Sequence, residues 1–406
     1  MMLYKSSRSV RPWKLSAASS SHLNMIRSLA ALAVAGGHVR NLFWVDYTNV
    51  KHPNPTLATV YFLTGLGHQA VLVFFVLSGF FISATVFKSG LERWSVQSFA
   101  IDRLSRLYVV LLPALILGAF LDGVTRRLPG GQAYFYRPIE HFGPAFEGSF
   151  TAKAFLGNLF FLQDSLVGPF GSNGPLWSLA NELWYYAFWA LLCLVLCGLS
   201  PRRRLIAGLL LVLCFLGISK SIWLLLPVWL MGTSVHGLSG VRCLSKRVPK
   251  VTALVVATIL FGTMVYLDKK QLLGTLGDYC VGAAFTVLLY ITLQCDFAVS
   301  VRYREVSKVF ADFSFSLYVT HFPVLVLLRA LTWRRPPMQP TLTSGLIVIL
   351  LLATVLLAGY LFSLGTEALT GRLRSRLQAV FSARTRILDR GILLGTSAET
   401  SGETVS

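Results

Sequence analysis

The sequence predicts an all-α integral membrane protein with about ten transmembrane helices. Its 406 residues are 54% hydrophobic and only 13% charged, and the mean hydropathy is +0.64. A water-soluble chain exposes too much of its surface to tolerate that composition. The apolar residues also gather in separate runs of about 20, which is the length of a helix that crosses the hydrocarbon core of a bilayer.

Ten apolar runs follow one another along the chain. The fifth and sixth are short and closely spaced, so a single re-entrant hairpin is an alternative for this pair. Residues 1–22 are basic and serine-rich and are expected to form a disordered arm, and residues 368–406 a basic, then polar, partly disordered tail. The transmembrane domain between them covers residues 23–367, with runs at about 24–44, 66–87, 104–121, 176–198, 204–219, 222–238, 251–268, 274–294, 310–332 and 343–364.

The basic residues predict how the helices are oriented. Lys and Arg residues concentrate in cytoplasmic loops of membrane proteins. With ten spans, the side that holds both termini collects 25 of the 37 Lys and Arg residues. Both termini are therefore expected in the cytoplasm, with the chain in the inner or plasma membrane of the cell. The net charge of +20 is explained by this topology, and we do not expect a nucleic-acid partner.

The first run carries two polar side chains on one face. Arg27 and His38 are eleven residues apart, which is about three helical turns and roughly 16 Å along the helix axis. Arg27 then lies near one membrane surface and His38 well inside. A titratable group at such a depth is costly and marks a functional-site hypothesis. The alternative is that His38 only hydrogen-bonds a neighbouring helix.

Two further runs place charged residues at the levels of Arg27 and His38. Arg103 and Arg106 begin the third run and are expected at the level of Arg27, although anchoring at the cytoplasmic surface would also explain them. Glu182 lies about seven residues into the fourth run, which we expect to be the depth of His38. A buried carboxylate needs a partner, and the sequence predicts that Glu182 pairs with His38.

The ninth run contains a proline inside a predicted helix. Pro323 cannot donate to the carbonyl one turn back, near Val319, and a Ser or Tyr side chain is expected to satisfy that carbonyl. Tyr318 and His321 share a face of this helix. His321 is interpreted first as structural and second as the next candidate for a catalytic residue.

The second run has small residues where helices are expected to meet. Gly79 permits close approach of a neighbouring helix. Ser78 can form a hydrogen bond across that contact. A structural role is therefore favoured for both residues.

Together these segments resemble the membrane-bound acyltransferase 3 family. They occur in the family's order and span about residues 23 to 325. Residues Ala180 and Asn181 differ from those of many relatives. The matching pieces are Arg27 with His38, the FFVLSGFFI run that contains Ser78, Arg103 with Arg106, LWSLANELWYY around Glu182, and SFSLYVTHFP around His321.

The resemblance implies transfer of an acyl group, often acetyl, from cytoplasmic acyl-CoA to a hydroxyl of a glycan, a lipid-linked sugar or a small molecule. It implies no metal, and the partners would be acyl-CoA, the acceptor and membrane lipid. The implied donor-binding residues are Arg27, Arg103 and Arg106, which suit phosphates. His38 would act as general base or acyl carrier, oriented by Glu182. Supporting or substrate-contacting residues would be Ser78, Trp177, Ser178, Tyr318 and His321.

Two other classes of protein are considered from the residues alone. A secondary transporter also buries His, Glu and Arg near the middle of the membrane, but it predicts an internal repeat, and we find none. A purely structural membrane scaffold would not need His38 and Glu182. Release of coenzyme A by the purified protein would separate an acyltransferase from both.

Overall fold

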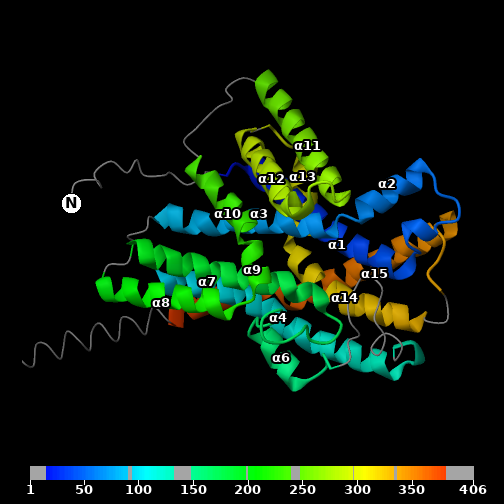
Figure 1. Ribbon diagram of the computed structural model, residues 1–406, viewed down its shortest axis with the longest axis horizontal. Helices are drawn as coiled ribbons and strands as arrows, with labels where there is room; N and C mark the ends of the chain where they lie inside the picture. The colour runs from blue at the N-terminus through cyan, green and yellow to red at the C-terminus, as the bar shows by residue number, and fades with distance from the viewer. Residues whose placement is uncertain are drawn as a thin grey trace, which may run out of the picture.

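The computed structural model describes most of the chain as α-helices with short connections (Figure 1). The predicted all-α fold is confirmed, since the described residues contain only two isolated β-bridges and no sheet. The described residues are 15–89, 94–131, 148–197, 200–238, 247–295, 297–332 and 336–380.

Each predicted apolar run coincides with one helix or with a pair of consecutive helices. The helices are α1 (Ala17–Phe43), α2 (Pro55–Thr64), α3 (Gly67–Ser89), α4 (Val96–Arg127), α6 (Ala152–Leu159), α7 (Trp177–Cys197), α8 (Pro201–Gly217), α9 (Lys220–Leu224), α10 (Leu226–Gly237), α11 (Arg247–Lys269), α12 (Gly277–Gln294), α13 (Val301–Asp312), α14 (Ser314–Leu331) and α15 (Leu342–Gly365). Short 3₁₀ turns lie at η1 (Tyr47–Asn49), η2 (Gly174–Leu176), η3 (Gly274–Leu276) and η4 (Glu367–Leu369).

Fewer helices than the predicted ten are long and apolar enough to cross a membrane. Among the described residues, seven helices are long and apolar enough to cross a membrane, and the pair formed by α8 and α9–α10 would make eight. That pair is bent by 110°, as expected of a broken or re-entrant span. Helix α1 is not among these helices, because Arg27, His38 and Arg40 lower its mean hydropathy. The count of about ten is therefore not confirmed.

The ends of the helical region differ from the predicted borders. Helix α1 begins at Ala17, where the Ser16 side chain accepts a hydrogen bond from the Ser19 backbone N–H at 3.0 Å. Such a cap satisfies one of the unpaired N–H groups of the first turn. Residues 17–22 of the predicted arm are thus helical, and helical residues continue after η4 to residue 380. The rest of the arm, residues 1–14, and the tail from residue 381 lie outside the described residues.

Helices α3 and α10 cross with their backbones in contact. A side chain at Gly79 would overlap the backbone carbonyl of Trp229, and one at Gly232 would overlap the carbonyl of Val76. Glycine at these two positions is what lets the helices approach so closely. The close contact predicted at Gly79 is confirmed, and it fixes the position of α3 beside the site.

Helix α14 continues through Pro323, and the carbonyl that this proline leaves without a helical partner is paired with a side chain from a loop. The Val319 carbonyl, which Pro323 cannot reach with an N–H, accepts a hydrogen bond from the Asn173 side-chain amide at 2.8 Å. The expected Ser or Tyr partner is therefore wrong, because the segment before η2 passes next to α14 at this point. That segment is held in turn by Asp122, whose carboxylate accepts from the Ser172 N–H at 2.8 Å and from its hydroxyl at 2.7 Å.

Candidate active site

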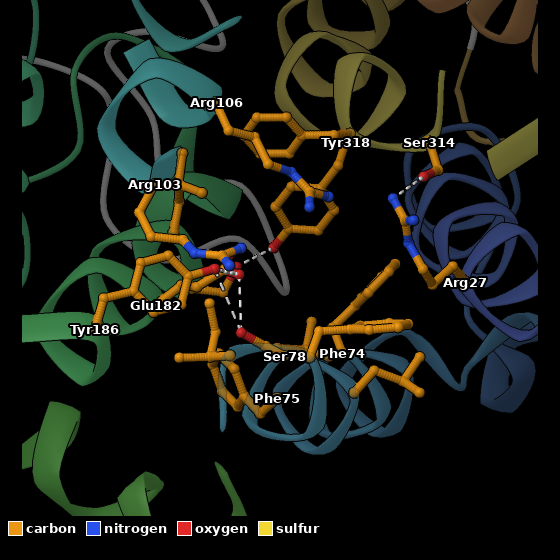
Figure 2. Close-up of a pocket in the computed structure, with 17 residues that line it drawn as sticks. Arg27, Phe74, Phe75, Ser78, Arg103, Arg106, Glu182, Tyr186, Ser314 and Tyr318 are labelled. Carbon is orange, nitrogen blue, oxygen red and sulfur yellow. Dashed lines mark hydrogen bonds between the residues drawn. The ribbon is translucent and has the colours of Figure 1, made fainter. Parts of the chain in front are cut away.

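Five helices far apart in the sequence surround a buried pocket that contains three arginines. Figure 2 shows this arginine pocket, with α1, α3, α4, α7 and α14 each contributing side chains. Its apolar wall comes mainly from α3 and includes Phe74 and Phe75. The polar residues that line it are Arg27, Ser78, Arg103, Arg106, Ser178, Glu182, Tyr186, Ser314 and Tyr318.

Glu182 belongs to the arginine pocket, and its partners are hydroxyl groups. The carboxylate accepts a hydrogen bond from Ser78 at 3.0 Å and another from Tyr186, one helical turn further along α7. Trp229 of α10 donates to the Ser78 hydroxyl at 3.2 Å. Ser78 thus joins α3, α7 and α10, which agrees with its predicted structural role.

The arginines bring positive charge to the same pocket. Arg27 donates to the Ser314 hydroxyl at 3.4 Å, and the Arg103 guanidinium lies over the Phe99 ring at 5.6 Å from its centroid. Glu182 is close enough to both arginines to interact with them electrostatically. The Nε of Arg103 is buried without a hydrogen-bond partner in the described part of the chain. Arg27, Arg103 and Arg106, which were expected at one level of the membrane, all line this pocket.

A second carboxylate near the arginines was not predicted. Glu367 in η4 accepts from the Ser316 N–H at 3.0 Å and from its hydroxyl at 2.9 Å, and it interacts electrostatically with Arg27 and Arg106. It therefore binds the first turn of α14, where a negative charge is favourable. The only signal in the sequence was a lone Glu directly after the last apolar run.

His38 is paired with another histidine. Its Nδ1 lies 2.8 Å from Nε2 of His321, and the planes of the two rings are nearly parallel, with 12° between them. Nδ1 of His321 lies 2.7 Å from the Tyr318 carbonyl oxygen, which can only accept, so this nitrogen carries the proton. In a neutral His321, Nε2 then accepts from Nδ1–H of His38. This assignment leaves the lone pair of His38 on Nε2.

The predicted pairing of His38 with Glu182 is therefore wrong. Glu182 lies in the arginine pocket with Arg27, whereas His38 lines a different pocket with Gly174 and Pro175, which precede α7. The prediction placed both residues at one depth by counting from the expected membrane surface. The helices instead place the carboxylate beside the arginines, because a buried negative charge is stabilised by nearby positive charge.

The pocket that holds His38, the histidine pocket, encloses about 410 Å³. Trp177 lines it together with residues of α1, α2, α3 and α11. Tyr318 and Val71 line both this pocket and the arginine pocket. The Tyr318 hydroxyl donates to the Pro175 carbonyl at 2.9 Å and lies 2.6 Å from the Ser178 hydroxyl, which must then donate to it. Tyr318 thus forms the boundary between the two pockets.

A third pocket, the entrance pocket, extends the row in the other direction. It shares Arg27, Phe81, Arg103 and Arg106 with the arginine pocket and also includes Ser20 near the start of α1. The three pockets therefore follow α1 from its first turns to its last. Neighbouring pockets share lining residues: Tyr318 and Val71 on one side, and the three arginines with Phe81 on the other.

Besides Glu367, two polar side chains that hold groups in or beside the site were not predicted. Tyr186 follows Glu182 by one turn on the same helix, a spacing that brings side chains together. Asn173 had no comparable signal, because its partner on α14 is far away in the chain. No group of three or more His, Cys, Asp or Glu side chains in the described residues is arranged to hold a metal ion.

The fold and the site define an integral membrane protein with buried polar side chains around three adjacent pockets. A family model described as an acyltransferase domain, that of acyltransferase 3, matches residues 21–363. The chain belongs to this family and is a membrane acyltransferase. Searches of curated proteins and of solved structures find no match.

Proposed function

We propose that the protein transfers an acyl group, acetyl in the simplest case, from cytoplasmic acyl-CoA to a hydroxyl of a glycan or lipid-linked sugar on the other side of the cell membrane. The observation that carries this proposal is the row of pockets that leads from Arg103 and Arg106 to His38. A donor held at the arginines and an acceptor held at the histidine would meet within the membrane. The distribution of basic residues favours the arginines on the cytoplasmic side.

The arginines fit a donor that carries phosphates. Guanidinium groups bind phosphate oxygens through paired, charge-assisted hydrogen bonds. Arg27, Arg103 and Arg106 line both the arginine pocket and the entrance pocket, so they border the path by which a donor would enter. The buried Arg103 Nε has no partner among the described residues, and a phosphate oxygen would supply one. Glu182 and Glu367 limit the repulsion among the arginines when no donor is bound.

His38 fits the role of general base. Its Nε2 would take the proton from the acceptor hydroxyl while that oxygen attacks the thioester carbonyl carbon. The carbon–sulfur bond then breaks, and the thiolate of coenzyme A leaves and takes up the proton from His38. In the alternative, His38 Nε2 attacks the thioester carbonyl carbon and the thiolate of coenzyme A leaves. The acyl group then passes from His38 to the hydroxyl oxygen, whose proton the thiolate takes up. In both cases His321 is a positioning residue that selects the tautomer of His38.

The donor site is tested by removing one arginine at a time. Each charge-assisted contact to phosphate contributes about 1.5–3 kcal/mol, so Arg103→Ala or Arg106→Ala should weaken coenzyme A binding about tenfold to hundredfold. The measurement is calorimetry of coenzyme A with purified, folded protein. Arg203→Ala is the matched control, because Arg203 is exposed at the start of α8 and lines none of these pockets. Unchanged affinity in both site variants would remove the arginines from the donor site.

A further inference from the structure

Among the residues that the structure describes, the wall of the histidine pocket carries positive charge and no carboxylate. Arg40 of α1, Lys269 at the end of α11 and His68 at the start of α3 all line it, and none of its lining residues is Asp or Glu. His68 is paired with Asp278, whose carboxylate lies 2.7 Å from His68 Nε2. The two cations that remain in the wall are therefore Arg40 and Lys269.

These cations are held in place by groups that do not neutralise them. The Arg40 guanidinium lies 5.0 Å from the centre of the Tyr61 ring, and its Nε is buried without a partner in the described part of the chain. Lys269 donates to the Gly65 carbonyl at 2.6 Å, which uses one of its three N–H donors. Each also lies in the last turn of its helix, where carbonyl dipoles favour a cation.

No carboxylate forms an ion pair with either cation among the residues that the structure describes. Asp46 and Asp268 are near enough to act on Arg40 and Lys269 electrostatically, but both lie outside the wall of the pocket. Arg40 and Lys269 are also close enough to repel each other. An oxyanion between them would relieve this repulsion and accept from their remaining N–H donors.

We propose that the acceptor carries an oxyanion, phosphate or carboxylate, that binds between Arg40 and Lys269 while its hydroxyl lies at His38. The three residues line one pocket of about 410 Å³, so the anion and the hydroxyl can belong to one molecule. Trp177 lines the same pocket and supplies an aromatic side chain for the body of a sugar. This inference rests on the proposed function and narrows its acceptor to anionic glycans or lipid-linked sugar phosphates.

The first test uses inorganic phosphate as the probe. The full chain, purified in detergent without added phospholipid, is titrated with phosphate at constant ionic strength while its thermal stability is followed. Arg40→Gln and Lys269→Gln should each weaken the saturable stabilisation about tenfold. Lys270→Gln is the matched control: it removes an equal charge next to Lys269, at a residue outside the pocket wall. General salt effects of phosphate are common to all variants.

Phosphate can also bind at the arginine pocket, and Arg103→Ala distinguishes the two sites. This variant should leave unchanged the part of the phosphate stabilisation that depends on Arg40 and Lys269. Equal phosphate affinity in wild type, Arg40→Gln and Lys269→Gln would overturn the inference. Coenzyme A affinity is measured on the same preparations and should not change in these two variants. Failure of wild type to bind coenzyme A would instead count against the proposed function, so the two failures are distinguishable.

The kind of oxyanion is identified by competition. Glucose 1-phosphate and methyl glucuronide are compared with uncharged methyl glucoside as competitors of phosphate in the stability measurement. Stronger competition by the sugar phosphate assigns a phosphate-bearing acceptor, and stronger competition by the glucuronide assigns a uronic acid. Competition by the uncharged sugar equal to that of both charged sugars would overturn the role of the anion.

Discussion

At the scale of single residues, the chemistry of the site depends on which partner orients His38. A carboxylate beside a histidine stabilises its charged form, whereas a second neutral histidine fixes its tautomer without adding charge. The observed partner is His321, itself held by the Tyr318 carbonyl. The resulting chain of hydrogen bonds directs the lone pair of His38 away from His321.

The histidine pair predicts a pattern of non-additive losses. His38→Ala should lower the transfer rate by about 10²–10⁴-fold, because a positioned base contributes an effect of that size. His321→Ala should lose less, since the base remains but its tautomer is no longer selected. The double variant should resemble His38→Ala alone, because the two residues act as a unit. The measurement is transfer per folded molecule, with coenzyme A affinity determined in parallel.

His52→Ala serves as the control for the histidine variants, because His52 is exposed and lies outside the pockets. If folded His38→Ala kept most of the transfer rate, the catalytic role of His38 would be excluded. If His321→Ala were as active as wild type, only the positioning role of His321 would be excluded.

At the scale of elements, the contact between α3 and α10 holds one wall of the arginine pocket. Gly79→Ala should lower the free energy of unfolding by about 1–3 kcal/mol, because the added methyl group meets the Trp229 carbonyl and the helices must separate. The measurement is thermal stability in detergent. Gly262→Ala on α11 is the matched control, since nothing lies within 4 Å of its new methyl group. Equal stability of both variants would contradict the contact.

The hydrogen bond from Asn173 to the Val319 carbonyl predicts a coupling between Asn173 and Pro323, which are far apart in the chain. Asn173→Ala leaves the Val319 carbonyl without its partner and should cost about 1–3 kcal/mol of stability. In a Pro323→Ala background, the new backbone N–H can satisfy that carbonyl within the helix. Asn173→Ala should therefore cost less there, which a double-mutant cycle of stabilities would measure. An equal cost in both backgrounds would argue against this role of Asn173.

At the scale of the whole molecule, the pockets and the basic residues together predict its orientation. The residues that line the entrance pocket lie toward the start of α1, and those of the histidine pocket toward its end. Reporter fusions after Thr151 and after Ser300 should therefore report opposite sides of the membrane, with Ser300 in the cytoplasm. Both reporters on one side would contradict the proposed direction of transfer.

The sequence by itself determined the class of fold and singled out most of the polar residues of the candidate site. The backbone N–H and C=O groups of an apolar run find no water in a bilayer. They must form hydrogen bonds with one another, and an α-helix pairs them within the run. Polar residues are rare in such runs, so Arg27, His38, Arg103, Arg106 and Glu182 could be singled out without a structure. The eleven-residue spacing on α1 also fixed the distance between the arginine level and His38.

Only the tertiary structure decided which of these groups are partners. Depth counted along each helix could not separate His321 from Glu182 as the partner of His38, because tilt and rotation are set by packing against neighbouring helices. Asn173 contacts the Val319 carbonyl and Lys269 lines the histidine pocket, each from the end of another element, and no local pattern marks such residues. Periodicity within one helix identifies its polar face, whereas the contacts between helices depend on how the whole bundle packs.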